Sequence, residues 1–343
     1  MTLMRDETLA SAACAAAFLG HGLAAAVAAG QELKNRKPRQ LEVLGRGSSS
    51  HAGTVLRYAV AAQGGLGVSA VMPSVAANQA DLGHLKDAAL IAISQSGRSP
   101  DLVRYANAAH AAGALVVGLI NTGGSPLGAA SHHEVALCAG PELAVAATKS
   151  VVMSVIAGLG LVAGFRDDPL LLAALDKLPG RLDQAAACDW SALAALLPGS
   201  QAVFFVGRGA DLGIAKELAL KVAEAVGIPA LAFSSAEFLH GPLGAVSART
   251  PVVGVASDLQ ALDSVLLALQ RARAHGATTL LAHGLPIASA AAAAQLPLPV
   301  CSGTVADVVL PLLPAYLAIE AAARAVGRNP DQPAGLAKVT ETL

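Results

Sequence analysis

Short, unbroken runs of apolar residues recur along the chain, and each is followed by a segment with the pattern of a helix. ALIAIS (Ala89–Ser94) and ALVVGLIN (Ala114–Asn121) are two such runs, and AVFFVG, PVVGVAS and TTLLAHG are later ones. Unbroken apolar runs of this length are typical of strands buried on both faces of a parallel sheet. Because strands and helices alternate, we predict a doubly wound α/β fold with helices on both faces of parallel sheets.

The pattern also indicates where some helices begin and end. Ser99 stands at a helix N-cap position, Pro100 at the first helical position and Gly113 just beyond the expected end. Longer apolar stretches predict helices over 146–164 and 305–326.

An internal repeat divides the chain into two similar halves. LEVLGRGSSSHAG begins at Leu41 and AVFFVGRGADLGIA begins at Ala202, and each runs from an apolar stretch through Gly-Arg-Gly into a helix-like stretch. The predicted divisions are a helical segment (1–40), a first α/β domain (41–165), a linker (166–200), a second α/β domain (201–327) and a tail (328–343).

Composition favours a globular protein that acts on a small molecule. The 343-residue chain is 54% hydrophobic and 14% charged, so apolar surface for a core is plentiful. Its formal net charge is −1 and 3% of its residues are aromatic, whereas nucleic-acid binders usually present a basic face with stacking aromatics. We interpret the basic run Lys34, Arg36, Lys37 and Arg39 as a solvated linker rather than an anion site, and we expect no nucleic-acid partner.

Cysteine usage and the apolar runs point to a cytoplasmic protein. Cys14, Cys138, Cys188 and Cys301 form no CxxC pair, so we expect neither a zinc site nor a disulfide framework. The Ala-rich stretch 9–30 lacks the basic start of a secretory leader and reads as a helix. Proline, glycine or charge interrupts the other apolar runs before the roughly 18 residues of a membrane span, so we expect no membrane partner.

Ligands of open α/β sheets bind at the carboxyl ends of the strands, where three loops of this chain fall. These loops are 47–50, 94–99 and 141–148. In the second loop Ser94, Gln95, Ser96 and Ser99 could donate hydrogen bonds to a phosphate at a helix N-terminus. The alternative is that Ser99 only caps the helix. The chain has no GxxxxGK[ST] pattern and no complete GxGxxG, so a nucleotide site is not favoured.

The second half contains a lysine, a carboxylate and a histidine that could carry out proton transfer. Lys221 and Glu224 are spaced i, i+3 and share a helix face, where they could shuttle a proton or form a surface ion pair. His240 precedes a Gly-Pro turn, where it could act on a ligand or be structural. The residue pattern alone leaves these alternatives open.

Six segments together resemble the SIS (sugar isomerase) domain family. They are GRGSSSHAG, ISQSGRSPDLV, AGPELAVAATKS, GRGADLGIAKELALKVAE, AEFLHGPLGAV and DQPAGLAKVTETL. The chain is particularly similar to the isomerase half of glutamine–fructose-6-phosphate aminotransferase and to SIS-type glucosamine-6-phosphate deaminases. The resemblance implies two tandem SIS domains, each a flavodoxin-like three-layer αβα sandwich around a parallel sheet.

The resemblance also implies roles for individual residues and no metal or redox cofactor. Glu224 is implied as the base that moves a proton between C1 and C2, and Lys221 as the group that stabilises the developing charge on the substrate oxygen. His240 is implied as the ring-opening histidine, supplied by the neighbouring subunit of a homodimer, and Lys338 as the tail lysine that forms a Schiff base in the synthase. The implied substrate contacts are Ser48, Ser49, Ser94, Gln95, Ser96, Ser99, Val145 and Ala147.

Departures from the synthase pattern favour a deaminase. The chain has no counterpart of the glutaminase domain, Thr2 stands where that domain has its cysteine nucleophile, and Ala147 stands where the synthase has a serine. We therefore expect conversion of glucosamine 6-phosphate to fructose 6-phosphate and ammonia. The alternatives are an aminotransferase-like isomerase lacking the glutaminase domain, a galactosamine or fructosamine 6-phosphate deaminase or deglycase, and a non-catalytic sugar-phosphate sensor.

Overall fold

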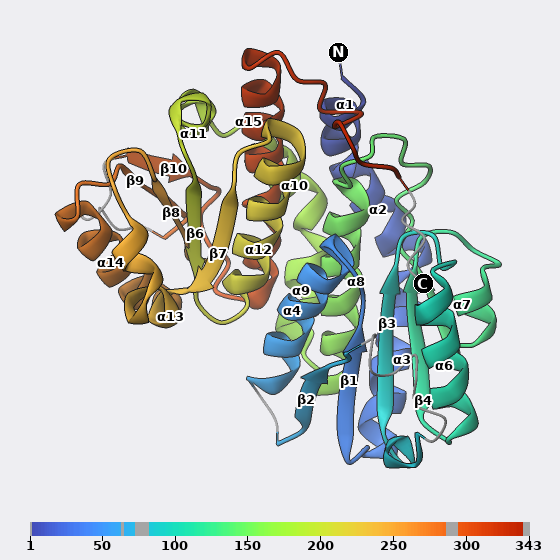
Figure 1. Cartoon of the computed structure of the whole chain (residues 1–343). Helices are drawn as coiled ribbons and strands as arrows, with labels where there is room; N and C mark the ends of the chain where they lie inside the picture. The colour runs from blue at the N-terminus through green and yellow to red at the C-terminus, as the bar shows by residue number, and fades with distance from the viewer. Residues whose placement is uncertain (1, 63–64, 73–81, 286–293, 339–343) are drawn as a thin grey trace. The chain divides into compact units, whose positions relative to one another are not determined.

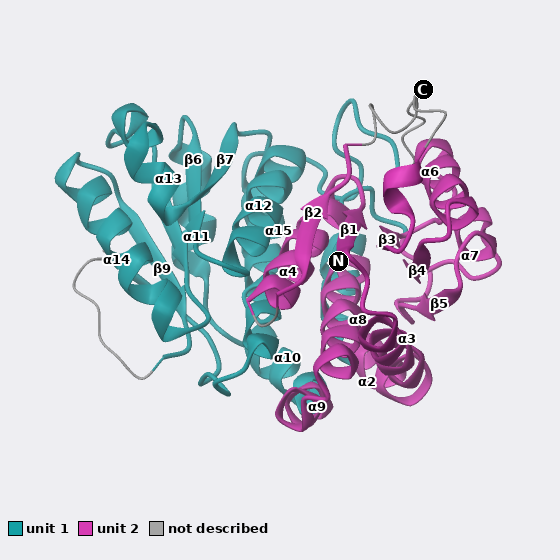
Figure 2. Ribbon diagram, turned by 90° about the horizontal axis from the view of Figure 1, so that it is seen from below, with its two compact units in different colours: residues 1–12, 143–148, 177–338 teal, residues 13–142, 149–176, 339–343 magenta. Residues whose placement is uncertain are grey.

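The computed structural model describes residues 2–62, 65–72, 82–285 and 294–338, which form two compact units (Figures 1 and 2). Unit 1 comprises the described residues within 1–12, 143–148 and 177–338, and unit 2 comprises those within 13–142 and 149–176. Each unit is built around one sheet. The last five residues of the predicted tail, 339–343, lie outside the described residues.

Unit 2 contains a five-stranded parallel sheet in the order β2-β1-β3-β4-β5. Its strands are β1 (Gln40–Leu44), β2 (Gly67–Ala70), β3 (Ala89–Ser94), β4 (Leu115–Ile120) and β5 (His133–Ala136). Its helices are α2 (Ser11–His21), α3 (Leu23–Arg36), α4 (Ser48–Ala61), η1 (Gly83–Leu85), α6 (Pro100–Ala111), α7 (Pro126–Ala129), α8 (Lys149–Arg166) and α9 (Pro169–Asp176). Helices α3, α4 and α8 pack on one face of the sheet and α6 and α7 on the other (Figure 2), which is why β3 and β4 are buried along their whole length.

Unit 1 contains the second parallel sheet, in the order β10-β9-β8-β6-β7. Its strands are β6 (Val203–Gly207), β7 (Ala230–Ser234), β8 (Val252–Val255), β9 (Thr279–His283) and β10 (Ala294–Pro297). Its helices are α1 (Leu3–Leu9), α10 (Leu178–Ala186), α11 (Ser191–Leu196), η2 (Leu197–Gly199), α12 (Asp211–Lys221), η3 (Val222–Val226), α13 (Ser235–His240), η4 (Pro242–Ala245), α14 (Leu259–Ala274), η5 (Val305–Val309) and α15 (Leu312–Ala325).

The two sheets confirm the predicted pair of doubly wound domains. Numbered within its own half, each sheet has the strand order 2-1-3-4-5, which is the flavodoxin-like order. The register also repeats: Leu44 pairs with Ala92 in one sheet and Val206 with Gly254 in the other, a shift of 162 positions in both strands (44 to 206, 92 to 254). This fold places a ligand-binding crevice between β1 and β3 in unit 2 and between β6 and β8 in unit 1.

Several elements differ from the sequence-based prediction. Strands β2, β7 and β10 had not been predicted, because they are short edge strands with half-exposed residues rather than unbroken buried runs. The segment 166–200, predicted as a linker, contains the helices α9, α10 and α11. The basic run predicted as a solvated linker lies partly in α3, which continues through Arg36.

Within the part of the chain that the structure describes, two segments are long and apolar enough to cross a membrane: Lys149–Arg166 and Val305–Ala325. The number is three if the bent pair α2 and α3 is counted as one span. The prediction that proline, glycine or charge interrupts the apolar runs is wrong for these two segments, because buried helices tolerate glycine and proline when neighbouring elements pack against them. In this fold 89% of the first segment and 83% of the second are buried inside the protein, so their apolar character is accounted for by core packing.

Candidate functional site

The loop after β3 is a compact turn whose serine hydroxyls retain a proton to donate. The Oγ of Ser94 accepts the Gly97 N–H at 2.9 Å, and the Oγ of Ser96 accepts the Arg98 N–H at 3.3 Å. Gly97 has φ of +64°, and a Cβ there would lie 2.1 Å from the Ser125 Oγ, so this position requires glycine. Because a hydroxyl that accepts one hydrogen bond still carries its own proton, both serines can donate to an anion.

The same loop leads into the N-terminus of α6, where Ser99 stands at the predicted N-cap position without forming a capping hydrogen bond. The carbonyl of Gln95 accepts the Thr122 N–H at 3.2 Å, which holds the loop against the segment after β4. The helix dipole favours an anion at this end of α6. Ser99 makes no capping hydrogen bond, and its role as a phosphate contact remains a prediction.

The loop after β1 forms the other wall of the unit 2 crevice. Ser48 and Ser49 lie half-buried in the first turn of α4, and the Ser49 N–H already donates to the Arg46 carbonyl at 3.0 Å. Arg46 Nε donates to Asp101 Oδ2 at 2.6 Å, and Asp101 is buried in the first turn of α6. This ion pair joins the two loops and neutralises a carboxylate that would otherwise repel a phosphate.

The equivalent crevice of unit 1 carries carboxylates instead of serines. By the 162-position shift, Asp211 replaces Ser49 and Asp258 replaces Ser96. Burial raises the pKa of Asp211 to about 7, although its Oδ2 accepts the Ser257 N–H at 3.0 Å. The loops of this crevice therefore offer carboxyl groups where the loops of unit 2 offer serine hydroxyls, which makes it the less favourable of the two for a phosphate.

Lys221 and Glu224 lie in contact in unit 1, as the spacing predicted. The Nζ of Lys221 is 2.5 Å from Glu224 Oε2 and 3.4 Å from Glu217 Oε1, and the Tyr316 hydroxyl donates to Glu217 Oε1 at 3.1 Å. The side chains of Lys221 and Glu217 are 1% exposed and that of Glu224 is 21% exposed. The surface ion pair considered as an alternative is therefore wrong, because the ammonium is buried.

Burial and the neighbouring charges give Lys221 and Glu224 different chemical roles. Burial alone would lower the pKa of the Lys221 ammonium, but the adjacent carboxylates of Glu217 and Glu224 outweigh burial and raise that pKa above its usual value. Lys221 therefore stays charged and can stabilise a negative oxygen, whereas Glu224 is the one carboxylate of the pair that solvent reaches.

Glu224 lies on a π-helical turn, η3, which continues directly from α12. Such turns are rare and frequently occur at functional sites. The turn ends at Gly227, which has φ of +73°, and a Cβ there would lie 2.0 Å from Cζ of Arg328. Gly227 thus allows the start of the tail to pack directly against the turn that carries Glu224.

Lys338 and the segment 143–148 form a second cluster in unit 1. The Nζ of Lys338 donates to the Ala144 carbonyl at 2.6 Å, and the Val145 N–H donates to the Asp331 carbonyl at 2.9 Å. The carboxylate of Glu7 accepts the N–H groups of residues 143 and 144 from the other side. The tail lysine and Val145 are therefore brought together, and Ala147 lies half-buried in the same segment.

His240 ends α13 and is exposed. Among the described residues it makes no hydrogen bond or ion pair with the other predicted site residues. Its exposure leaves the imidazole available to a ligand or to another chain, and the predicted role across subunits remains a prediction.

Sequence reasoning missed the residues that support the site. Glu217 had a usable signal, since it precedes Lys221 by four residues on one helix face. Glu7 and Asp331 had none, because their partners are distant in sequence: Glu7 binds a backbone N–H 136 positions away, and Asp331 binds one 328 positions away. Among the described residues, no group of three His, Cys, Asp or Glu side chains is arranged to hold a metal ion.

The fold and the repeated switch-point loops agree with a family comparison. The model of the SIS domain family matches residues 34–163 and 196–297, so the chain belongs to the SIS domain family.

Individual relatives are similar over most of the chain. A glutamine–fructose-6-phosphate aminotransferase of Pseudomonas syringae pv. tomato is 33% identical over 257 residues, which is 70% of this chain and 41% of the relative. The chain thus spans about two fifths of the length of that relative. A second relative is a crystal structure from Silicibacter pomeroyi DSS-3 named "putative phosphosugar isomerase". It is 35% identical in sequence with a TM-score of 0.88, and the match covers 96% of this chain and 100% of the chain in that structure. The C-terminal domain of the Francisella tularensis glucosamine-fructose-6-phosphate aminotransferase has a TM-score of 0.84 at 22% identity over 97% of this chain and 98% of its own, which indicates the shared fold.

Proposed function

We propose that this chain converts glucosamine 6-phosphate and water to fructose 6-phosphate and ammonia through proton transfer between C1 and C2. The observation that carries the proposal is the Glu217–Lys221–Glu224 cluster, in which a buried ammonium lies beside one partly exposed carboxylate. A proton-transfer catalyst needs such a carboxylate, and an enolamine with a developing negative oxygen needs a fixed positive charge.

In the proposed reaction the hydroxyls of Ser94, Ser96 and Ser99 bind the substrate phosphate and so position C1 and C2. His240 of a neighbouring subunit assists ring opening. Glu224 removes the C2 proton and returns it to C1 through an enolamine, and Lys221 stabilises the negative oxygen. The resulting C2 imine takes up water and releases ammonia. Lys338 orients the open-chain sugar.

The direct test measures ammonia and fructose 6-phosphate released from glucosamine 6-phosphate. Glu224→Gln should bind the substrate with unchanged affinity but react at least a hundredfold more slowly, as expected for loss of a general base. Lys86→Gln, at an exposed position, is the matched control and should keep the parent rate. A Glu224→Gln rate within tenfold of the parent would rule out the base assignment. Binding without turnover by the parent would indicate a sensor instead.

The second candidate function is synthesis in the reverse direction, because the curated relative at 33% identity is named an aminotransferase. The same residues would serve both directions. Fructose 6-phosphate with ammonium or with glutamine, and a panel of galactosamine and fructosamine 6-phosphates, distinguish the alternatives. If His240 acts across subunits, mixing His240→Ala with Glu224→Gln should restore part of the activity.

A further inference from the structure

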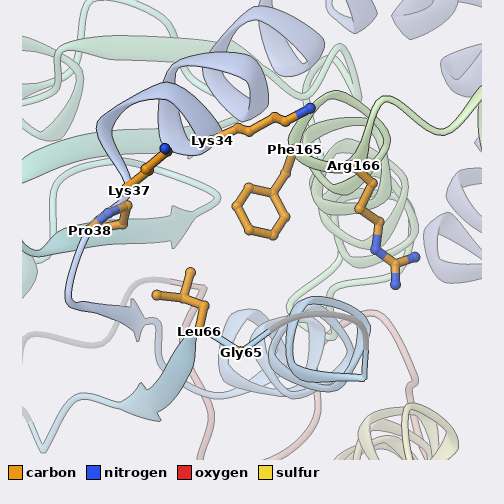
Figure 3. Close-up of a pocket in the computed structure, with 7 residues that line it drawn as sticks. All are labelled: Lys34, Lys37, Pro38, Gly65, Leu66, Phe165 and Arg166. Carbon is orange, nitrogen blue, oxygen red and sulfur yellow. The ribbon is translucent and has the colours of Figure 1, made fainter.

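A pocket of about 460 Å³ lies in unit 2, away from the loops described above (Figure 3). It is lined by Lys34, Lys37 and Arg166 together with Pro38, Leu66 and Phe165. Pro38 lies two residues before β1 and Leu66 directly precedes β2, so the pocket lies at the amino ends of these strands. The serine loops follow the carboxyl ends of β1 and β3, which places the pocket at the opposite end of the same sheet.

The charged lining of the pocket is entirely basic. Lys34 is paired with Asp167, which lies outside the lining, whereas Lys37 is exposed and has no ion pair among the described residues. Arg166 is the least satisfied: its side chain is 11% exposed, and its Nη1 is 4.0 Å from Asp168 Oδ2, beyond hydrogen-bond reach.

Within the described residues, the buried Nε of Arg166 has no hydrogen-bond partner. Burial lowers the pKa of this guanidinium, with Asp168 opposing the shift. A buried donor without an acceptor is costly and rare, so the position of Arg166 needs an explanation.

Helix termini account for part of this arrangement. Helices α3 and α8 pack together and end at Arg36 and Arg166, and the negative ends of their dipoles attract Lys34 and Arg166 even without a ligand. They do not account for Lys37, which follows α3 with φ of +47°, a conformation unfavourable for a residue with a Cβ. Nor do they account for an apolar recess beside the unsatisfied guanidinium.

The apolar part of the lining faces the same space as the lysines. Figure 3 shows the Phe165 ring between Lys34 and Leu66, with Lys37 and Pro38 on one side of the ring and Arg166 on the other. The volume is in the range that encloses a small organic molecule, and a few polar groups within apolar walls are typical of such sites. A ligand that fits would carry an anionic group toward the cations and an apolar face toward the ring.

We infer that this pocket binds a small organic phosphate. The Arg166 guanidinium holds the phosphate, Lys37 adds positive charge on the other side of the recess, and the apolar portion packs against Phe165 and Leu66. The planar guanidinium can supply the paired N–H donors that phosphate oxygens accept, and its burial strengthens that interaction. The site is separate from the proposed reaction, and its existence does not depend on the substrate assigned above.

The test measures binding of phenyl phosphate by calorimetry at low ionic strength, with phenol and inorganic phosphate as half-ligands. Phenyl phosphate should bind at least tenfold more tightly than either half-ligand. Arg166→Gln should weaken binding about tenfold, since a charged hydrogen bond is lost. Lys37→Gln should weaken binding about threefold, since a nearby positive charge is lost. Leu66→Glu should abolish binding, because it places a negative charge in the recess.

Lys86→Gln is the matched control, since this exposed lysine of unit 2 does not line the pocket. It should bind phenyl phosphate like the parent. Circular dichroism checks that each variant folds. If Arg166→Gln does not fold, the proposal is tested by Lys37→Gln and Leu66→Glu, which lie at exposed or half-buried positions. Binding by those two variants within twofold of the parent would overturn the proposal, as would an equal loss in Lys86→Gln.

Discussion

Replacing Lys221 with methionine tests the electrostatic reasoning about the proton-transfer cluster. The substitution keeps most of the side-chain volume and removes the ammonium, which is 1% exposed and lies between Glu217 and Glu224. Glu217, also 1% exposed, would then be a buried carboxylate without its cation. Removing one partner of a buried ion pair costs about 3–5 kcal/mol, because the remaining charge is uncompensated.

The effect can be measured as the free energy of unfolding in urea. Trp190, the only tryptophan of the chain, is 3% exposed and donates to the Pro297 carbonyl at 2.9 Å within unit 1, so its fluorescence reports the unit that contains the cluster. The pKa of Lys221 is raised in the folded protein, so its stabilising effect is complete below its ordinary value of 10.5 and is lost only as the pH rises through the folded pKa. A measurement at pH 7 therefore captures the whole effect.

Two further variants make the result decisive. Lys221→Met combined with Glu217→Gln should recover at least half of the lost stability, because Glu217 no longer carries a charge. Lys177→Met, an exposed lysine of the same unit, should change the unfolding free energy by less than about 0.5 kcal/mol. A loss below about 1 kcal/mol for Lys221→Met, or no recovery in the double variant, would refute the view that the ammonium compensates Glu217.

Three other outcomes are expected. Gly227→Ala should lower the unfolding free energy by about 1–2 kcal/mol, because alanine is unfavourable at φ of +73° and its Cβ must displace Arg328; an unchanged urea midpoint would contradict this. Burial lowers the pKa of His132, whose Nδ1 accepts the Val116 N–H, so the melting temperature of the protein should fall as the pH drops below about 6.5. It should fall less in His132→Asn, which keeps a hydrogen-bond acceptor. Melting temperatures that fall equally with pH in the parent and the variant would contradict the role of His132. Ser99→Ala should change the unfolding free energy in urea by less than the ~1 kcal/mol that an N-cap hydrogen bond contributes. It should weaken glucosamine 6-phosphate binding several-fold in calorimetry. A larger loss of stability with unchanged binding would show that Ser99 acts as a helix cap.

Local patterns were sufficient to predict the central part of each domain. Unbroken apolar runs identified β3 and β8, and the Ser-Pro start and glycine end identified α6, since these features act through neighbouring residues. The Gly-Arg-Gly repeat predicted two halves that share one topology. Once strands are assigned, the carboxyl-end rule for parallel sheets places the serine loops at the crevice.

Contacts between distant segments decided the rest. The edge strands β2, β7 and β10 carry no unbroken apolar run, and their position depends on pairing with a neighbour already in place. Whether Lys221 is a surface ion pair or a buried cation depends on Tyr316 and the elements packed over it, which no local spacing encodes. For the same reason a basic run that looked like a solvated linker became part of a pocket, because α8 brings Phe165 and Arg166 alongside it. Sequence determines which chemistry is available at each position, and tertiary packing determines which charges are buried and what they face.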